Sequence, residues 1–482
     1  MEPGMKALLM LPSFLGNKFG NEWRKNPTVT PPLGLLYVAG ALERSGFEVR
    51  VLDLNVEKIE WEAFETLVNN SDVVGLSILT HVREAARELI REMREIKPWV
   101  KIICGGPYIN STLKPFPGAD LTFVGEGDET AGEVCRHLVR SDMERLRGFR
   151  GLMFYEHGEL VRTGSPEVLK DLNRFSVPAR HLIDASRYGE LVGIRLSSRI
   201  TAIASSRGCR SACGFCNRRG IFRYRYRETR NVVDEIEHIA DAGYDLLVFN
   251  EDNFAVNPQR GIDIMREIKR RGIGIRIMLQ LRVDSISDES ITAFKEAGVW
   301  CLIFGIESGT QEILDYYTKE TTVEQGRAAV QAADRFGIFT FGFFILGAPS
   351  ERDRHFRENL KFMTSIPLDF VGFNILDYEF GARIWAEKAR EGVIAPTQII
   401  VPTGPLFGAL SYSDLQRYLR WSYRKFYLRP RHYLRLWIKC LKNRDFTLFL
   451  FMMKLSMKLF QRFRPFALAD ALPVGTAMED RP

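Results

Sequence analysis

The sequence predicts an α/β protein: a doubly wound parallel sheet, then a partial (β/α)6 barrel, then a mainly helical C-terminal region. At 482 residues the chain is too long for one ordinary hydrophobic core. Short β-rich runs alternate with helical runs in the first 140 residues, and a second alternating series begins near residue 200. We therefore expect domains at residues 1–140 and 195–395, a connector at 141–194 and a helical region at 396–482.

The first alternating series begins with a buried strand at residues 5–11. Pro31 and Pro32 then open an amphipathic helix that ends near Gly46, a residue typical of helix C-termini. Ligands of such doubly wound sheets bind beyond the carboxyl ends of the strands. The other predicted elements are the strands FEVRVLDLN, SDVVGLSILT, VKIICGGPY and ADLTFVGEG, and the helix REAARELIREMREIK.

The second alternating series follows a connector in which GLMFYEHGELVRTG predicts a hairpin. Helical runs separate its strands, and most of these runs end in or near Gly. Parallel strands with helical crossovers form a partial barrel, whose chemistry lies at the C-terminal ends of the strands. The predicted strands are TAIASS, DLLVFNED, IRIMLQLRVD, WCLIFGIESG, FTFGFFILGAPS and DFVGFNIL.

The composition is that of a globular protein, with 45% apolar and 26% charged residues. The seven cysteines are odd in number and three are clustered, which argues against a disulfide framework and favours a reducing cytoplasm. The run MKALLMLPSF lacks the basic lead-in and the cleavage site of a secretory signal. The net charge of +7 belongs to the C-terminal region, where residues 415–465 hold 14 Lys and Arg and a single acid, Asp445.

The stretch SSRGCRSACGFCNRRG places Cys209, Cys213 and Cys216 in a C-x3-C-x2-C pattern directly after the first predicted barrel strand. Gly208 and Gly214 give the backbone the freedom to fold three thiolates around one cluster. A structural zinc site needs four ligands, and no His or Cys follows within the next twenty residues. A [4Fe–4S] cluster with one iron open to an exogenous ligand fits the missing fourth thiolate.

This segment resembles the radical S-adenosylmethionine (SAM) enzymes, whose signature has this spacing and an aromatic residue before the last cysteine, here Phe215. The resemblance implies that the open iron binds the amino and carboxylate groups of SAM. It further implies that an electron from the cluster cleaves SAM to methionine and a 5′-deoxyadenosyl radical. Such chemistry needs a reducing partner, such as ferredoxin or flavodoxin, and a barrel that excludes water.

The resemblance extends along the barrel over about residues 195–377, with polar residues or glycine at the ends of successive strands. It implies contacts with the SAM amino group after the second strand, its carboxylate after the third, its ribose or carboxylate after the fourth, and adenine beside the fifth. Each motif alone is weak, because acidic residues at strand ends are often only helix N-caps. The candidates are, in that order, Glu251 and Asp252, Gln280 and Arg282, Glu307 and Ser308, and Gly347.

A doubly wound domain before such a barrel resembles the cobalamin-binding subclass of these enzymes. Glycines at strand ends let the backbone approach the flat corrin, although each is also typical of a tight βα turn. Methyl-transferring cobalamin proteins often carry D-x-H-x-x-G after the first strand, but the loop PSFLGNKFGNEWRKN has no histidine. Either the cobalt binds without a protein histidine or this domain has lost its cofactor. We expect the first, cobalamin without a protein histidine ligand, and we interpret His81 as an ordinary residue at a helix start. The candidate cobalamin contacts are Ser77, Gly105, Gly106, Gly125, Glu126 and Gly127.

The C-terminal region from Tyr418 is dense in Arg, Lys and large apolar side chains, and its longest apolar run, 448–453, is too short to span a bilayer. Two interpretations stay open: a helix on an anionic membrane surface, or a helix that packs on the barrel with a solvated basic face. The first predicts a cytoplasmic protein at the inner surface of a membrane. Nucleic-acid binding ranks lower, because base stacking requires fewer Leu, Phe and Met residues.

Relatives that the tail resembles, the hopanoid C-2 methylase and the anaerobic magnesium-protoporphyrin ester cyclase, act on membrane-partitioned molecules. This resemblance implies a cobalamin-dependent methyltransferase that acts on an unactivated carbon of a lipid-like or isoprenoid-like substrate. Two alternatives stay open: an oxidative or ring-forming enzyme of the cyclase type, and a non-catalytic iron–sulfur electron carrier or sensor. Tyr378 and Glu379, after the sixth strand, either hold substrate or pack the barrel mouth.

Overall fold

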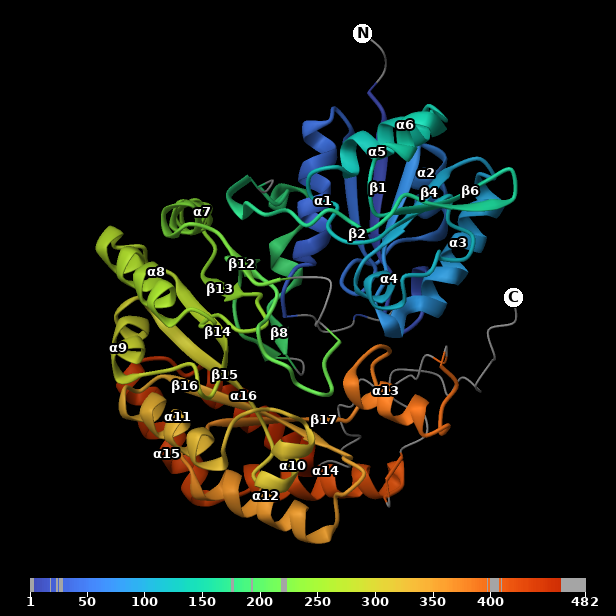
Figure 1. Cartoon of the computed structure of the whole chain (residues 1–482). Coiled ribbons are helices and arrows are strands. Elements are labelled where there is room, and N and C mark those ends of the chain that lie inside the picture. The colour runs from blue at the N-terminus through green and yellow to red at the C-terminus, as the bar shows by residue number, and fades with distance from the viewer. Residues whose placement is uncertain are drawn as a thin grey trace. The chain divides into compact units, whose positions relative to one another are not determined.

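The computed structural model divides the chain into two compact units, residues 1–189 and 190–482, each with its own main sheet (Figure 1). The boundary lies inside the segment 141–194 that the sequence suggests as a connector. The structure describes residues 4–17, 19–22, 25, 29–174, 177–191, 194–217, 223–396, 398, 407–408 and 410–460.

The first unit is built on a seven-stranded sheet in the order β2-β1-β3-β4-β5-β6-β7, whose first five strands are parallel. Apolar runs bury the central strands on both faces, as parallel sheets require. The expected doubly wound sheet is thus confirmed. The strands are β1 (Lys6–Leu11), β2 (Glu48–Asp53), β3 (Val73–Ser77), β4 (Lys101–Gly105), β5 (Leu121–Phe123), β6 (Leu152–Glu156) and β7 (Glu159–Arg162).

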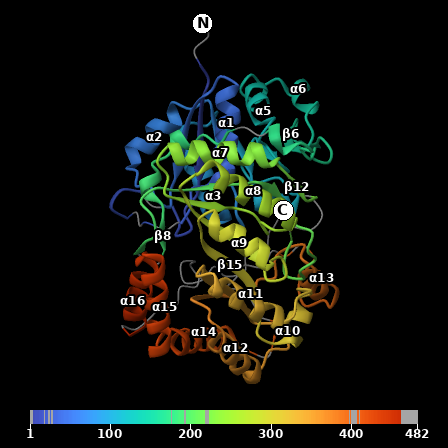
Figure 2. The same cartoon turned by 90° about the vertical axis from the view of Figure 1, so that its left-hand side faces the viewer.

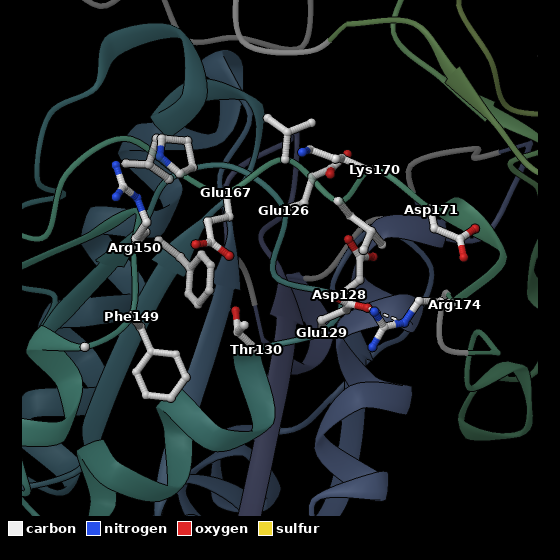
Figure 3. Close-up of a pocket in the computed structure, with 16 residues that line it drawn as sticks. Glu126, Asp128, Glu129, Thr130, Phe149, Arg150, Glu167, Lys170, Asp171 and Arg174 are labelled. Carbon is white, nitrogen blue, oxygen red and sulfur yellow. Dashed lines mark ion pairs between the residues drawn. The ribbon is translucent and has the colours of Figure 1, made fainter.

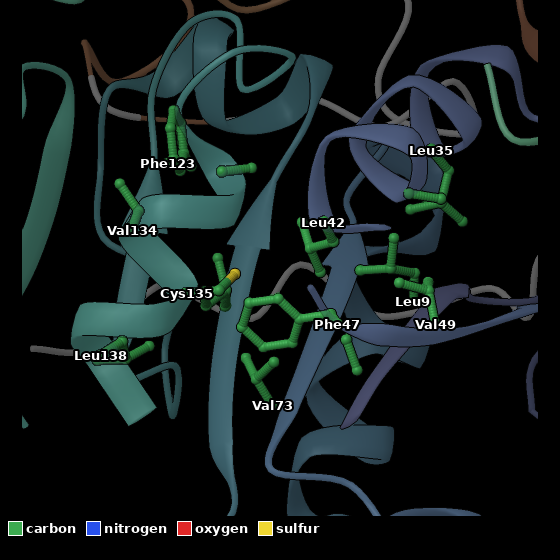
Figure 4. Close-up of a cluster of buried hydrophobic side chains, with 14 of the residues drawn as sticks. Leu9, Leu35, Leu42, Phe47, Val49, Val73, Phe123, Val134, Cys135 and Leu138 are labelled. Atoms are coloured by element: carbon green, nitrogen blue, oxygen red, sulfur yellow. The ribbon is translucent and has the colours of Figure 1, made fainter. Parts of the chain in front are cut away.

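Helices cover the sheet of the first unit and enclose its core. Leu42 of α1 and Val134 of α5 lie in one buried cluster with Phe47 and with Cys135, which acts there as a small apolar side chain (Figure 4). The predicted hairpin is also confirmed, because β6 pairs antiparallel with β7 and extends the sheet beyond β5. The helices are α1 (Leu33–Arg44), α2 (Trp61–Asn69), α3 (Arg83–Ile96), α4 (Pro107–Thr112), α5 (Ala131–Val139) and α6 (Met143–Arg147).

The second unit contains six parallel strands in the order β10-β13-β14-β15-β16-β17, which confirms the expected partial barrel. The sheet is open, with β10 and β17 at its edges. Two short ribbons, β8 (Glu190–Leu191) with β9 (Ile194–Arg195) and β11 (Ser206–Arg207) with β12 (Arg225–Tyr226), flank its first strand. The main strands are β10 (Ile200–Ile203), β13 (Leu246–Phe249), β14 (Arg276–Arg282), β15 (Val299–Glu307), β16 (Phe339–Leu346) and β17 (Phe370–Ile375).

Helical crossovers connect the barrel strands, and some helices of this unit begin at a side-chain cap. The side chains of Ser287, Thr322 and Ser411 each accept the backbone N–H three residues later, which satisfies one free donor at the helix start. The helices are α7 (Thr229–Asp241), α8 (Pro258–Arg271), α9 (Asp288–Glu296), α10 (Gln311–Tyr316), α11 (Val323–Arg335), α12 (Asp353–Ser365), α13 (Arg383–Arg390), α14 (Tyr412–Tyr427), α15 (Pro430–Asn443) and α16 (Thr447–Phe460).

The helices α14, α15 and α16 pack beside the last barrel strands (red in Figure 2). The Tyr427 hydroxyl accepts the Val371 N–H at 2.9 Å and donates to the Val371 carbonyl at 3.0 Å, which satisfies the free edge of β17. Lys439 is 5% exposed, and its Nζ lies 2.7 Å from Oδ2 of the fully buried Asp369. At least one positive charge of the C-terminal region is therefore buried in an ion pair inside the unit and does not face solvent. Among the described helices, none is long and apolar enough to cross a membrane.

Candidate active site

The three clustered cysteines lie on the loop between β11 and β12, beyond the C-terminal end of β10, as the sequence predicts. None of the three forms a disulfide, and all three are half-buried. The loop is fixed at Gly214, whose N–H donates to the Tyr317 carbonyl at 2.7 Å and whose carbonyl accepts the Ile384 N–H at 3.0 Å. A Cβ atom at Gly214 would lie 2.9 Å from Arg383 Cζ, so the Arg383 side chain would have to move to make room for any other residue here. The residue that follows α10 and a residue of α13 thus hold the loop by backbone hydrogen bonds.

Two cations lie near the Cys213 thiol. Arg282 Nη1 lies 3.6 Å from the Cys213 sulfur. Burial raises the pKa of the Cys213 thiol, and the nearby Lys319 and Arg282 oppose that rise by favouring the thiolate. Within the described residues no group of three or more His, Cys, Asp or Glu side chains converges as for one metal ion. An iron–sulfur cluster binds each of its thiolate ligands through a different iron.

The predicted SAM-carboxylate residue Arg282 is buried and held from two sides. Its Nε and Nη2 donate to the two carboxylate oxygens of Asp284 at 3.0 and 2.9 Å. Nη2 also donates to the Lys319 carbonyl at 2.7 Å. Gln280 is exposed on the same strand, between the buried Leu279 and Leu281. The strand thus presents one fixed cation beside the cysteine loop and one free amide.

Glu307, the predicted ribose or carboxylate residue, ends β15 at a register shift and has a φ of +65°. This left-handed backbone is unusual for a residue other than glycine and turns the side chain out of the strand pattern. Its Oε1 lies 2.8 Å from Lys319 Nζ, and the two side chains are only 9% and 7% exposed. The predicted Ser308 is fully buried, and its hydroxyl lies 3.1 Å from Thr310 Oγ1 and 3.2 Å from Asn359 Oδ1.

The predicted Glu251 contacts the backbone segment that precedes the cysteine loop. Its carboxylate accepts the Ser205 N–H at 2.6 Å and the Ser206 hydroxyl. Burial raises the pKa of Glu251, and the hydrogen bonds from these serines oppose the rise. Arg260 of α8 donates to the Ser205 carbonyl at 2.7 Å, so both sides of this backbone unit are held. The neighbouring Asp252 is half-buried.

Gly347, the predicted adenine neighbour, follows β16 with a φ of +109°. Its N–H donates to the fully buried Glu351, which also accepts the Ala348 N–H at 3.0 Å. Burial raises the pKa of Glu351 to about 7. Phe215 of the cysteine loop meets the ring of Tyr317 edge to face, with centroids 5.4 Å apart.

Several residues of this site were missed by the sequence analysis. Lys319, Tyr317 and Asn359 contact predicted residues, but each lies in or beside a helix and no local pattern distinguishes it. Glu351 is the last residue of the motif FILGAPSE, so its place after a barrel strand could have identified it as a site residue. Burial also raises the pKa of Asp377, beyond β17, to about 7, and Glu379 adds to this rise.

The first unit brings Ser77, Gly105 and Gly106 together at the C-terminal ends of β3 and β4. A Cβ atom at Gly106 would lie 2.9 Å from the Ile78 carbonyl and 3.3 Å from Ser77 Oγ, and the φ of +107° favours glycine. Close approach at this edge therefore depends on the absence of a side chain. His81 stacks on Phe14 with centroids 4.5 Å apart, and burial lowers its pKa to about 4.

Gly125, Glu126 and Gly127 form the loop after β5. Gly125 has a φ of +94°, and its N–H donates to Asn110 Oδ1 at 2.7 Å. Glu126 lines a cavity of about 610 Å³ that also exposes Lys170 and other side chains of both charge signs (Figure 3). Ser77, Gly105 and Gly106 are not among the residues that line this cavity.

Two protein-family models match the chain: a B12 binding domain over residues 24–135 and the radical SAM superfamily over residues 203–363. The chain is a radical SAM enzyme with a B12-binding domain. The family expected from the cysteine motif and the N-terminal sheet is thereby confirmed, as are the cobalamin and SAM classes of cofactor that these domains bind.

This radical SAM enzyme is similar along most of its length to characterised and uncharacterised relatives. It is 27% identical to an uncharacterized methyltransferase of Pyrococcus horikoshii, over 89% of this chain and 93% of that protein. It is also 27% identical to the anaerobic magnesium-protoporphyrin IX monomethyl ester cyclase of Rubrivivax gelatinosus, over 74% of this chain and 65% of the cyclase.

A solved structure shares the fold of this radical SAM enzyme. It is a radical SAM methyltransferase from Kitasatospora setae with cobalamin and a [4Fe–4S] cluster bound. The TM-score is 0.63 at 21% identity, over 81% of this chain and 75% of that one.

Proposed function

We propose that this enzyme is a cobalamin-dependent methyltransferase that acts on an unactivated carbon of a hydrophobic substrate. The observation that supports the radical step is the cysteine loop at the C-terminal end of the barrel, where the Arg282 guanidinium lies 3.6 Å from the Cys213 sulfur. A buried cation beside a thiolate favours ligation of a metal cluster, because it offsets the negative charge that the thiolates bring.

In this proposal Cys209, Cys213 and Cys216 hold three irons of a [4Fe–4S] cluster, and the fourth iron binds SAM. When bound, the cluster supplies the electron that cleaves SAM, and cobalamin carries the methyl group. The fit of the protein to the cluster rests on three half-buried thiols that form no disulfide and lie on a loop fixed at Gly214.

The protein residues around the cysteines bind and orient SAM in this proposal. Asp284 and the Lys319 carbonyl hold Nε and Nη2 of Arg282, so Nη1, beside the cysteine loop, is the donor that suits the carboxylate of SAM. The exposed Gln280 amide on the same strand adds a second donor. Asp252 suits the amino group. Glu251 and Ser308 already make protein hydrogen bonds, so their part is to hold the loop and the turn beside the site.

Cobalamin would lie at the edge formed by Ser77, Gly105 and Gly106, where the absence of side chains lets a flat ring approach the backbone. We propose that no protein histidine ligates the cobalt. Burial keeps His81 neutral and its ring is stacked on Phe14, which supports a packing role for this side chain. The loop Gly125–Glu126–Gly127 would contact the cofactor from the next strand.

A second candidate is an oxidative or ring-forming reaction, which the similarity to the anaerobic cyclase favours. The two reactions differ in their products. Methylation through cobalamin consumes a second SAM and yields S-adenosylhomocysteine beside 5′-deoxyadenosine, whereas the cyclase-type reaction yields only 5′-deoxyadenosine. The incubation would use membrane lipid extracts as the source of substrate, and reduced flavodoxin or ferredoxin as the donor of electrons.

The test is made on protein purified and reconstituted without oxygen with iron, sulfide and hydroxocobalamin. We expect about four irons and one cobalamin to remain after desalting, and SAM cleavage on reduction. The variant Cys213→Ala should lose SAM cleavage, and Cys301→Ala, which alters a buried cysteine of the same barrel, should retain it. Cleavage retained by Cys213→Ala would exclude the radical assignment.

A further inference from the structure

An exposed apolar surface lies on the C-terminal helices. Of the fifteen large apolar residues that are exposed in the described part of the chain, eight lie between residues 434 and 457. Single exposed apolar residues are normal, but a cluster of this kind marks a surface that another molecule covers. The eight are Leu434, Trp437, Ile438, Leu441, Phe446, Leu450, Met453 and Met457, and we name them the α15–α16 patch.

The patch has the periodicity of two helical stripes. On α15 the exposed residues recur at intervals of three and four, whereas Leu436, Lys439 and Cys440 on the opposite side are buried. On α16 the exposed stripe is likewise opposite the buried residues Met452 and Leu455. The helices therefore each bury one apolar face in the unit and leave a second apolar face uncovered by the described residues.

Aromatic contacts join the two stripes into one surface. The ring of Trp437 on α15 lies 5.1 Å from the ring of Phe446 and 4.8 Å from that of Phe449, centroid to centroid. The two helices lie side by side in Figure 2 and contact each other directly. Trp437 therefore connects the two stripes through these ring contacts, and at 41% exposure it also faces solvent.

Basic side chains surround the patch. Arg431, Lys442, Arg444 and Lys454 are exposed on or between α15 and α16, and the described structure gives none of them a carboxylate partner. On a helical projection, Arg431 and Lys442 lie directly beside the stripe of α15, and Lys454 lies beside that of α16. The acid between the helices, Asp445, already lies 3.3 Å from Arg276. Apolar residues flanked by cations are typical of a helix face that lies in the interface of an anionic membrane.

We propose that the α15–α16 patch binds the surface of an anionic lipid bilayer. The charges favour this occupant over a second copy of the chain, because an isologous contact would bring two basic faces together. Within the described residues neither helix is long and apolar enough to cross a membrane, and the contact that we propose is a peripheral one. This proposal does not depend on the reaction that the barrel catalyses.

The test is flotation of the full-length reconstituted protein with vesicles of phosphatidylcholine alone or with one part in four of phosphatidylglycerol. We expect binding to the anionic vesicles, weakened by 0.5 M NaCl, and little binding to the neutral ones. Leu441→Glu/Leu450→Glu should weaken binding at least about tenfold, because it places carboxylates in the apolar stripes. Lys442→Gln/Lys454→Gln should weaken it about 25-fold, or about fivefold for each lost charge.

The matched control is Trp99→Glu, which alters a 73% exposed apolar residue of the first unit and should leave vesicle binding unchanged. Equal thermal melting of all variants shows that they are folded. The proposal is wrong if the wild type binds neither kind of vesicle, or if both patch variants bind as well as it does. A wild-type dimer that Leu441→Glu/Leu450→Glu dissociates, without vesicle binding, would assign the patch to a second copy. Binding gained only after deletion of residues 461–482 would assign it to that segment.

Discussion

Removal of the Lys319 ammonium is expected to destabilise the second unit by about 3–5 kcal/mol. Lys319 Nζ lies 2.8 Å from Glu307 Oε1, and both side chains are less than one-tenth exposed. At an effective dielectric constant of about 20, the attraction at this distance is about 6 kcal/mol, from which the desolvation of both charges is subtracted. In Lys319→Met the Glu307 carboxylate stays desolvated and has lost its partner.

The measurement is urea unfolding followed by tryptophan fluorescence and circular dichroism, with the four variants of a double-mutant cycle. Four of the seven tryptophans lie in the second unit, so fluorescence reports its transition. We expect Lys319→Met/Glu307→Gln to lose only about 1–2 kcal/mol, because no buried charge remains. Arg335→Met, which removes one partner of an exposed ion pair, should cost less than about 1 kcal/mol. Strictly additive losses of the two single variants in the double variant would refute the reasoning.

Three further predictions concern other parts of the fold. Because burial raises the pKa of Glu351 from 4.5 to about 7, the free energy of unfolding should fall as pH rises through this window, by about 2 kcal/mol between pH 5 and 7.5. Urea titrations at these two pH values should show this fall in the wild type and not in Glu351→Gln. Tyr427→Phe removes both hydrogen bonds between Tyr427 and Val371 at the edge of β17 and should cost about 1–3 kcal/mol in the same titration, where an unchanged midpoint would contradict the capping role. Gly106→Ala places a Cβ 2.9 Å from the Ile78 carbonyl and should lower the cobalamin retained after desalting, whereas Gly34→Ala, with open space around it, should not.

The sequence predicted those features that local patterns determine. The C-x3-C-x2-C spacing after a strand located the cysteine loop, and the alternation of strands and helices predicted both sheets. Strand ends gave Arg282 and Glu307, which the structure brings close to Cys213, because the carboxyl ends of parallel strands meet at one edge of a sheet.

Partners that are distant in sequence could not be predicted in this way. Nothing near Lys319, in the connection between α10 and α11, indicates that its ammonium meets Glu307 inside the unit, because a lysine is usually solvated. Likewise the sequence of the C-terminal region does not distinguish buried from exposed basic residues. In the structure Lys439 is buried against Asp369, whereas Lys442 is exposed. Which side of a helix is buried depends on the tertiary packing, which charge composition alone does not encode.

The edge of β17 has a consequence for the synthesis of the protein. The hydroxyl that satisfies Val371 belongs to Tyr427, 56 residues later, and the ammonium that pairs with Asp369 belongs to Lys439, 70 residues later. At about 5–20 residues per second, the ribosome needs roughly 3–14 s to add these partners. During that interval the nascent barrel has an unpaired strand edge and a carboxylate without its cation, a state in which the edge can pair with another chain.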